Sequence, residues 1–147
     1  MSEDVADLLS ELSRQFRVEL RQAMNLDKAQ TTPFQNEVLA CVGRNPGANP
    51  NSLSDITGRD KGQITRIIAE LEILGLLRRE KSASDRRSVS VNLTQSGEEV
   101  FQRVLAKRAA LSDKMLSSLS AKDRSALVEM LRRMRSDLHM AVDRAEL

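Results

Sequence analysis

The sequence predicts a mainly α-helical protein with one small β-hairpin, an α+β arrangement. Three observations predict it. Apolar residues recur at steps of three and four over most of the chain, which is the spacing of amphipathic helices. Residues 88–93 instead alternate between apolar and polar side chains, as a half-buried strand does. Directly before this hairpin, a short helix, a tight turn and a second helix are expected, so the fold class is a winged helix-turn-helix with added terminal helices.

Composition bounds the class of protein. The 147 residues are 40% hydrophobic and 30% charged, which favours a folded domain over a disordered chain. Only 2% are aromatic, so Leu, Ile, Val and Met must fill the core. One cysteine, Cys41, excludes an internal disulfide and any multi-cysteine metal cluster. No stretch resembles a signal peptide or a membrane span, which predicts a cytoplasmic protein.

The chain divides into three predicted regions. Residues 1–31 form an N-terminal helix that is part of a dimerisation layer, residues 32–94 form the winged helix-turn-helix core, and residues 95–147 form C-terminal dimerisation helices. The terminal helices carry more apolar surface than is needed to cover a small core. An intertwined homodimer accounts for that surface. A helical layer over the core of a monomer is the alternative.

Apolar stripes mark these terminal helices. In the first helix the stripe consists of Val5, Leu8, Leu9, Leu12, Phe16, Leu20 and Met24. Thr94 is expected to cap a long helix over residues 95–119, and Ser120 with Asp123 to begin the last one. The last stripe consists of Leu127, Met130, Leu131, Met134, Leu138 and Val142.

Capping residues mark the central helices. The sequence TPFQ at residues 32–35 combines an N-cap, a proline at the first helical position and a glutamine that can close a capping box. The helix is predicted to run to about residue 42. Residues 43–51, rich in Gly, Pro and Asn, are predicted as a loop. A short helix over residues 52–57 follows, with Leu53 and Ile56 facing inward.

The second helix of the helix-turn-helix follows a turn at residues 58–60. Asp60 is its predicted cap, Gln63 completes the capping pattern, and Gly75 stops the helix after residue 74. Its expected buried residues are Ile64, Ile67, Ile68, Leu71 and Leu74. A hairpin follows, with strands at residues 76–81 and 88–93 and a polar tip between them.

Positive charge gathers in this central part, although the formal net charge is only +2. Residues 59–94 contain eight basic and five acidic side chains. Such a centre suits a polyanion, although charge runs are more often solvated faces. A helix fits the major groove of DNA, where Gln63 can bridge an adenine edge and Arg66 can reach guanine or a phosphate. Lys61 and Thr65 are candidates for phosphate contacts, and the backbone amides at the helix start favour a nearby phosphate.

The hairpin tip supplies a second candidate DNA contact. A narrow minor groove concentrates negative potential and attracts arginine, and Arg86 and Arg87 lie at the tip. Asp85 can hold and aim the guanidinium of Arg87 through paired hydrogen bonds. A surface ion pair of little energetic value is the alternative.

These segments resemble the MarR family of bacterial regulators. The sequence DRRSVSVNLTQSG at residues 85–97 fits the family's wing signature, D-x-R-x-x-x-V-x-L-T-x-x-G, and residues 64–79 resemble its recognition helix and exit. The resemblance implies a homodimeric winged helix-turn-helix regulator, usually a repressor, on a palindromic operator. It also implies that small phenolic or amphipathic ligands, or oxidation, often relieve repression.

Carried over by position, Thr65 and Arg66 would contact DNA from the recognition helix. Arg87 would enter the minor groove, with Asp85 orienting it. Many family members have hydroxyl residues where this chain has Gly62 and Gln63, so the operator sequence does not follow from the resemblance.

The regulatory signal is left open between three cases. A ligand pocket between the helical layer and the core would have as walls Leu12, Phe16, Val38, Cys41, Val42, Leu105 and Met115. Without Tyr or Trp a phenol-stacking site is poor, so a ligand-independent regulator is an alternative. A regulator that responds to oxidation of Cys41 is the other alternative. The apolar neighbours of Cys41 predict an inert thiol, and the resemblance places the reactive cysteine of oxidation-sensing members in the first helix.

Neither a cofactor nor an enzymatic activity is predicted. The single histidine, His139, lacks neighbouring residues that could complete a metal site. The sequence shows no nucleophile-base-acid grouping and no phosphate-binding loop. An enzyme is the competing class, and a helical interaction module that has lost DNA binding is the third.

Overall fold

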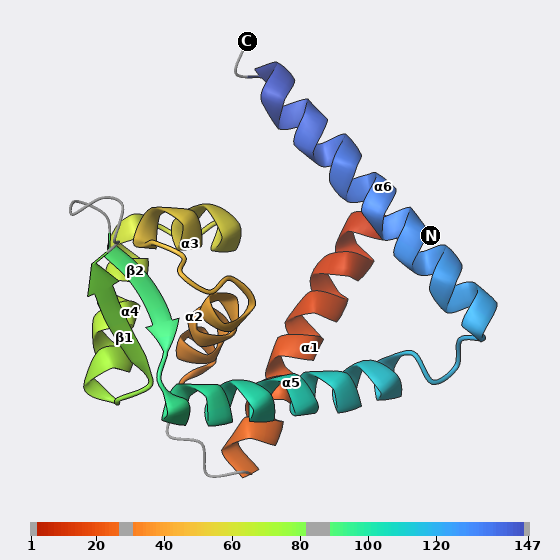
Figure 1. Ribbon diagram of the computed structural model, residues 1–147. Helices are drawn as coiled ribbons and strands as arrows, with labels where there is room; N and C mark the ends of the chain where they lie inside the picture. Colours follow the sequence, from red (N-terminus) through yellow and green to blue (C-terminus); the bar gives the residue numbers. More distant parts are fainter. Residues whose placement is uncertain (1–2, 27–30, 82–88, 146–147) are drawn as a thin grey trace. The chain divides into compact units, whose positions relative to one another are not determined.

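The computed structural model describes residues 3–26, 31–81 and 89–145 (Figure 1). The described elements are α1 (Val5–Leu26), α2 (Pro33–Arg44), α3 (Pro50–Thr57), α4 (Lys61–Ile73), β1 (Leu77–Lys81), β2 (Val89–Leu93), α5 (Gln95–Met115) and α6 (Ala121–Ala145). The predicted fold class, mainly α with one two-stranded antiparallel hairpin, is confirmed. The chain forms two compact units, residues 1–111 and 112–147. None of the described helices is long and apolar enough to cross a membrane.

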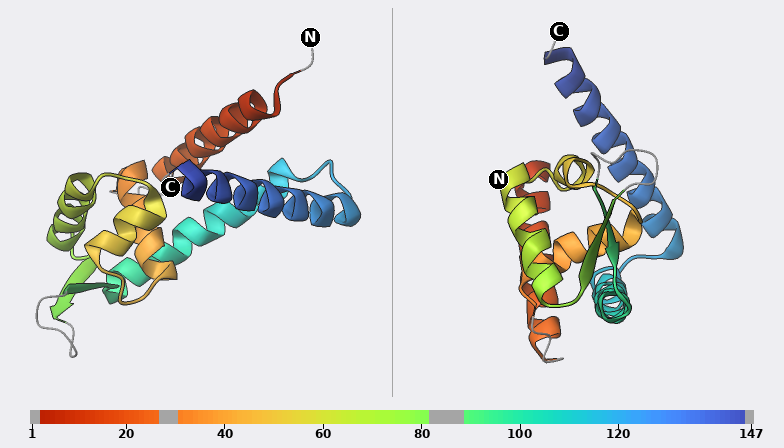
Figure 2. Two further views of the ribbon diagram at one scale, coloured as in Figure 1. Left: turned by 90° about the horizontal axis from the view of Figure 1, so that it is seen from above. Right: turned by 60° about the vertical axis from the view of Figure 1, so that its left-hand side comes forward.

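The core of the first unit is built around α2, which contacts α3, α4 and β2 (Figure 2). Its side chains Val38, Leu39 and Val42 are almost completely buried. The fully buried residues that pack in the same cluster include Leu53, Ile64, Ile68, Leu71, Val91 and Val104. Aliphatic side chains thus fill this core, with Phe101 of α5 as its single buried aromatic residue among those described.

Three caps fix where the central helices begin. Thr32 accepts a hydrogen bond from the Gln35 amide, and Gln35 returns one to the Thr32 amide, so the predicted capping box is confirmed. Asn49 and Ser52 form a second capping box at α3, with Pro50 at the first helical position. Asp60 caps α4, as predicted.

The hairpin is joined to the core by a third backbone segment. Strands β1 and β2 pair antiparallel, with Leu77 opposite Leu93. The Val91 amide donates to the Ala48 carbonyl at 2.8 Å, and the Gly47 amide donates to Asn92 Oδ1 at 2.9 Å. The stretch between α2 and α3, predicted only as a loop, therefore binds the edge of β2 that is not paired with β1.

A group of backbone and side-chain hydrogen bonds joins the end of α4 to the start of α5. Gly75 has φ +72°, and the Leu76 amide donates to the Leu71 carbonyl at 2.9 Å, as in a Schellman C-cap. Thr94 Oγ1 donates to the Gly75 carbonyl at 2.6 Å and accepts from the Gly97 amide at 3.0 Å. Thr94 therefore caps α5, as predicted, and also ties that helix to the end of α4.

The second unit holds the last turn of α5 and the whole of α6. The Asp123 amide donates to Ser120 Oγ at 3.1 Å, which confirms the predicted start of the last helix. Arg124 donates to the carbonyls of Leu116 and Leu119 and so closes the turn before α6. Large apolar residues of α6 are exposed to solvent in the single chain, namely Val128, Met130, Leu131, Met134, Leu138, Met140 and Val142.

Four local predictions were wrong. Helix α3 begins at Pro50 rather than at residue 52, because Asn49 provides the cap, and α5 ends at Met115 rather than at residue 119. Ile56, predicted to face inward, is 55% exposed, because α3 buries only the face that carries Leu53. Leu74, predicted to be buried, is 43% exposed at the C-cap, beyond the last helical turn that packs on the core.

Candidate nucleic-acid interface

Helix α4 buries one face in the core and presents the other to solvent. Its buried residues are Ile64, Ile67, Ile68 and Leu71. The four predicted DNA contacts on this helix are all exposed, and they are Lys61, Gln63, Thr65 and Arg66. They lie within its first six residues, so the structure brings them together on the half of α4 that follows the turn.

Two details define the chemistry of this exposed face. Thr65 Oγ1 donates its proton to the Lys61 carbonyl at 2.9 Å, which leaves its oxygen free to accept. The Nε atom of Arg66 lies 3.8 Å from Glu70 Oε1, one turn further along, and the Arg66 side chain is 67% exposed. The terminal nitrogens of this guanidinium therefore stand in solvent, where they can reach an anionic or base-edge acceptor.

The start of α4 differs from the expectation that its amides favour a phosphate. Asp60 Oδ2 accepts from the Gly62 amide at 3.0 Å and from the Gln63 amide at 3.3 Å. Both amides are thus occupied by a carboxylate of the protein itself, and that expectation was wrong for these two groups. Gln63 does not return a bond to Asp60 among the described contacts, so its side-chain amide stays available.

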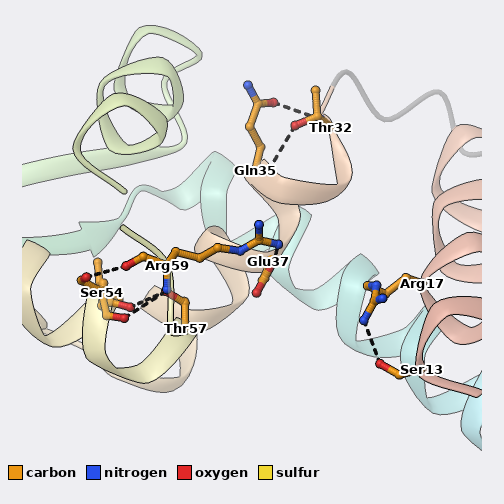
Figure 3. A network of polar contacts seen from close by, with 9 residues as sticks. Ser13, Arg17, Thr32, Gln35, Glu37, Ser54, Thr57 and Arg59 are labelled. Carbon is orange, nitrogen blue, oxygen red and sulfur yellow. Dashed lines mark hydrogen bonds and ion pairs between the residues drawn. The ribbon is translucent and has the colours of Figure 1, made fainter. Parts of the chain in front are cut away.

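Arg59 fastens the turn between α3 and α4 to α2 (Figure 3). Its guanidinium lies 3.1 Å from Glu37 Oε2 and 4.5 Å from the ring centroid of Phe34. Its carbonyl accepts from Ser54 Oγ at 2.6 Å, and its amide donates to Thr57 Oγ1 at 3.3 Å. The turn that sets the angle of α4 is therefore held by side chains from two helices. Sequence reasoning missed this role, because Glu37 and Phe34 are distant from Arg59 in the chain.

The base of the hairpin carries two further arginines that are tied down. Arg79 Nε lies 2.6 Å from Glu72 Oε1 of α4, and Arg78 pairs with Glu80 and donates to the Leu93 carbonyl at 2.8 Å. These arginines serve the frame of the wing rather than its tip. The predicted tip contacts Asp85, Arg86 and Arg87 lie outside the described residues, so their role stays a prediction.

Comparison with known proteins identifies this arrangement. The model of the MarR family matches residues 31–89, the segment that holds the helix-turn-helix and most of the hairpin. A crystal structure of MarR matches the whole of this chain and 99% of that chain, at 26% sequence identity and a TM-score of 0.81. The chain therefore resembles the MarR family in the sequence of residues 31–89 and in its whole fold. It is a winged helix-turn-helix transcriptional regulator.

Curated relatives of the chain are transcriptional regulators. The chain is 28% identical over 103 residues to the transcriptional regulator HosA of Escherichia coli O157:H7, across 70% of this chain and 76% of HosA. It is 32% identical over 94 residues to the transcriptional repressor MprA of Escherichia coli K12, across 64% of this chain and 53% of MprA. Among solved structures, the MepR–DNA complex of S. aureus matches 92% of this chain and 96% of that chain, at 19% sequence identity and a TM-score of 0.78.

The residues of the predicted effector pocket lie in several different environments. Val38, Cys41 and Val42 are buried in the core cluster, and Leu105 packs against it. On α1, Leu12 is exposed, and Phe16 stacks under the Arg108 guanidinium at 5.2 Å. Met115 belongs to the other compact unit. A pocket with these walls stays a prediction.

Cys41 lies in an environment that disfavours the thiolate. Its side chain is buried, and this burial raises the pKa of the thiol, against smaller opposing effects of the Arg44 charge and of a hydrogen bond from Asn45. Because the thiolate is the reactive form, a raised pKa makes the residue a poor nucleophile near neutral pH. The oxidation-responsive alternative therefore receives no support from the surroundings of Cys41.

Proposed function

We propose that this MarR-family regulator is a homodimeric repressor that binds a palindromic operator in the cytoplasm. In this proposal the N-terminal half of α4 enters the major groove and the hairpin tip enters the adjacent minor groove. The observation that carries the proposal is the exposed polar face of α4, with Gln63, Thr65 and Arg66 presented from a helix that is rigidly held by the core. The name of MprA, a transcriptional repressor, supports repression as the sign of regulation.

The dimer is proposed from apolar surface that the single chain leaves uncovered. Helix α1 exposes Val5, Leu8, Leu9 and Leu12, and α6 exposes apolar residues along most of its length. Exposed apolar stripes of this size on two long helices are unusual for a monomer and mark an interaction surface. We assign residues 1–31 and 95–147 to the dimerisation layer and residues 32–94 to the DNA-binding core, each half-site being read by one core.

Relief of repression by a small molecule is the proposed mode of control. The alternative is a ligand-independent repressor. The lack of Tyr and Trp favours it, because a phenolic ligand would have neither a Tyr nor a Trp ring to stack on. Two measurements on candidate aromatic carboxylates and phenols separate a ligand-controlled repressor from a ligand-independent one. Calorimetry measures the heat of ligand binding, and titration of the operator measures any loss of DNA affinity.

Replacement of Arg66 by alanine is expected to weaken operator binding by about five- to one-hundredfold, the range for one arginine that discriminates a guanine. The measurement is selection of bound duplexes from a randomised library, followed by titration of the preferred duplex. Base preference should be lost at one symmetric pair of positions.

Arg103→Ala, the same change on the exposed surface of α5, is the matched control and should leave base preference intact. An Arg66→Ala protein that selects the same sequences as the wild type would rule out base reading by Arg66. Arg87→Ala should lower affinity with a smaller change in preference, because the minor groove distinguishes bases poorly.

A further inference from the structure

The buried side chain of Gln35 connects the start of α2 to the exposed face of α4. Gln35 is only 9% exposed. Its Nε2 donates to Glu70 Oε2 at 3.0 Å, and its Oε1 accepts from the Thr32 amide at 3.0 Å. The carboxamide is thus engaged at both ends, and rotation would break two hydrogen bonds in a partly buried site. Gln35 is therefore a rigid anchor for the carboxylate of Glu70.

The second oxygen of this anchored carboxylate faces Arg66. Glu70 Oε1 lies 3.8 Å from Arg66 Nε, at an i,i+4 spacing along α4. An exposed ion pair usually contributes little, partly because both side chains must lose conformational freedom to form it. Here the hydrogen bond to Gln35 already restricts the side-chain conformation of Glu70. Only the Arg66 side chain must lose conformational freedom to form the ion pair.

We propose that Glu70 is a positioning residue for Arg66, with Gln35 as its anchor. The proposal rests on the proposed function, in which Arg66 reads a base. Glu70 holds the guanidinium on its Nε side, and the terminal nitrogens then remain free to donate to the O6 and N7 acceptors of a guanine. In this way the anchored carboxylate of Glu70 favours one orientation of the Arg66 guanidinium in the free protein.

This role has a signature that a purely structural one lacks. The carboxylate of Glu70 lies near the DNA-facing surface, and its charge repels phosphates. Its removal should therefore leave non-specific affinity unchanged or raise it, whereas discrimination at the base read by Arg66 should fall. A residue that only stabilised the fold would lower both together.

Glu70→Gln is the first test variant, because an amide oxygen can still accept from Gln35 while the charge beside Arg66 is lost. Discrimination at the Arg66 position should fall about twofold, near the upper end of what one i,i+4 ion pair contributes. Gln35→Glu is the second variant, in which a carboxylate can still accept from the Thr32 amide but faces Glu70 with like charge. It should show the same loss.

Glu72→Gln is the matched control. It removes the same charge from the same helix, but Glu72 pairs with Arg79 of β1 rather than with Arg66. It should change overall affinity much as Glu70→Gln does and leave base preference at the Arg66 position as in the wild type. Equal base preferences in Glu70→Gln and Glu72→Gln would overturn the proposal.

A measurement without DNA separates this proposal from the proposed function. The order parameter of the Arg66 Nε–H group, obtained by ¹⁵N relaxation on the free protein, should be higher in the wild type and in Glu72→Gln than in Glu70→Gln and Gln35→Glu. Equal mobility of that group in all four proteins would refute positioning by Glu70. A different outcome is that Arg66 is ordered as expected but Arg66→Ala leaves base preference unchanged. In that case Arg66 does not read a base, and Glu70 cannot position it for that purpose.

Discussion

Replacement of Gly97 by alanine is expected to lower the free energy of unfolding by about 3 kcal/mol, near the upper end for overpacking of a core. A Cβ atom at this position would lie 1.9 Å from the Leu76 carbonyl oxygen and 2.9 Å from its carbon. Both are backbone atoms, so no side chain can rotate away to make room. The same carbonyl accepts a hydrogen bond from the Thr94 amide at 3.1 Å. The clash would therefore disturb the hydrogen bonds that join the end of α4 to the start of α5.

The measurement is denaturant unfolding at a fixed protein concentration, because the proposed dimer would make apparent stability depend on concentration. Gly47→Ala is the matched control. Gly47 has a positive φ, +78°, which Gly97 does not, but nothing lies within 4 Å of its added Cβ, so only backbone strain of about 1 kcal/mol is expected. A Gly97→Ala protein no less stable than Gly47→Ala would contradict the close approach of α5 to the end of α4.

Replacement of Leu138 by glutamate is expected to dissociate the dimer and to lower operator affinity by about one-hundredfold or more, the gain normally provided by linking two binding sites. Leu138 is 70% exposed in the single chain, so its replacement should not disturb the folded monomer. It belongs to the apolar stripe on α6. A carboxylate there would be buried without a partner in a dimer interface, which is strongly unfavourable.

Sedimentation velocity gives the mass of the particle, and titration of the operator duplex gives the affinity. Met140→Glu is the matched control, since Met140 is 54% exposed and lies two residues away, on the opposite side of the helix. It should remain dimeric with unchanged affinity. If Leu138→Glu keeps the mass and operator affinity of the wild type, α6 does not form the interface.

Local signals in the sequence predicted the helical frame well. Thr32, Asp60, Thr94 and Ser120 all cap helices as expected, because a cap is formed between residues two or three apart. The hairpin followed from strand alternation, although only Val91 of β2 is fully buried. These features depend on neighbours in the chain and can be recognised without a structure.

Contacts between distant segments could not be predicted in the same way. Gln35 was expected to close a capping box, and it does, but its bond to Glu70 joins residues 35 positions apart. The ties of Arg59 to Glu37 and Phe34 depend on how α2 packs beside the turn before α4. Exposure of Ile56 was misjudged for the same reason, because helical spacing shows which residues share a face but not which face finds a partner.

The central claim is that a dimer of this chain reads a two-fold symmetric DNA site through α4. The most direct test is a nuclease footprint of the wild-type protein on the region upstream of its own coding sequence. Two protected half-sites are expected, related by a two-fold axis and centred about one helical turn, roughly 10 base pairs, apart. Protection should weaken steeply as salt is raised, because phosphate contacts release counterions. A single unsymmetric protected half-site, or no protection at low salt, would contradict the account.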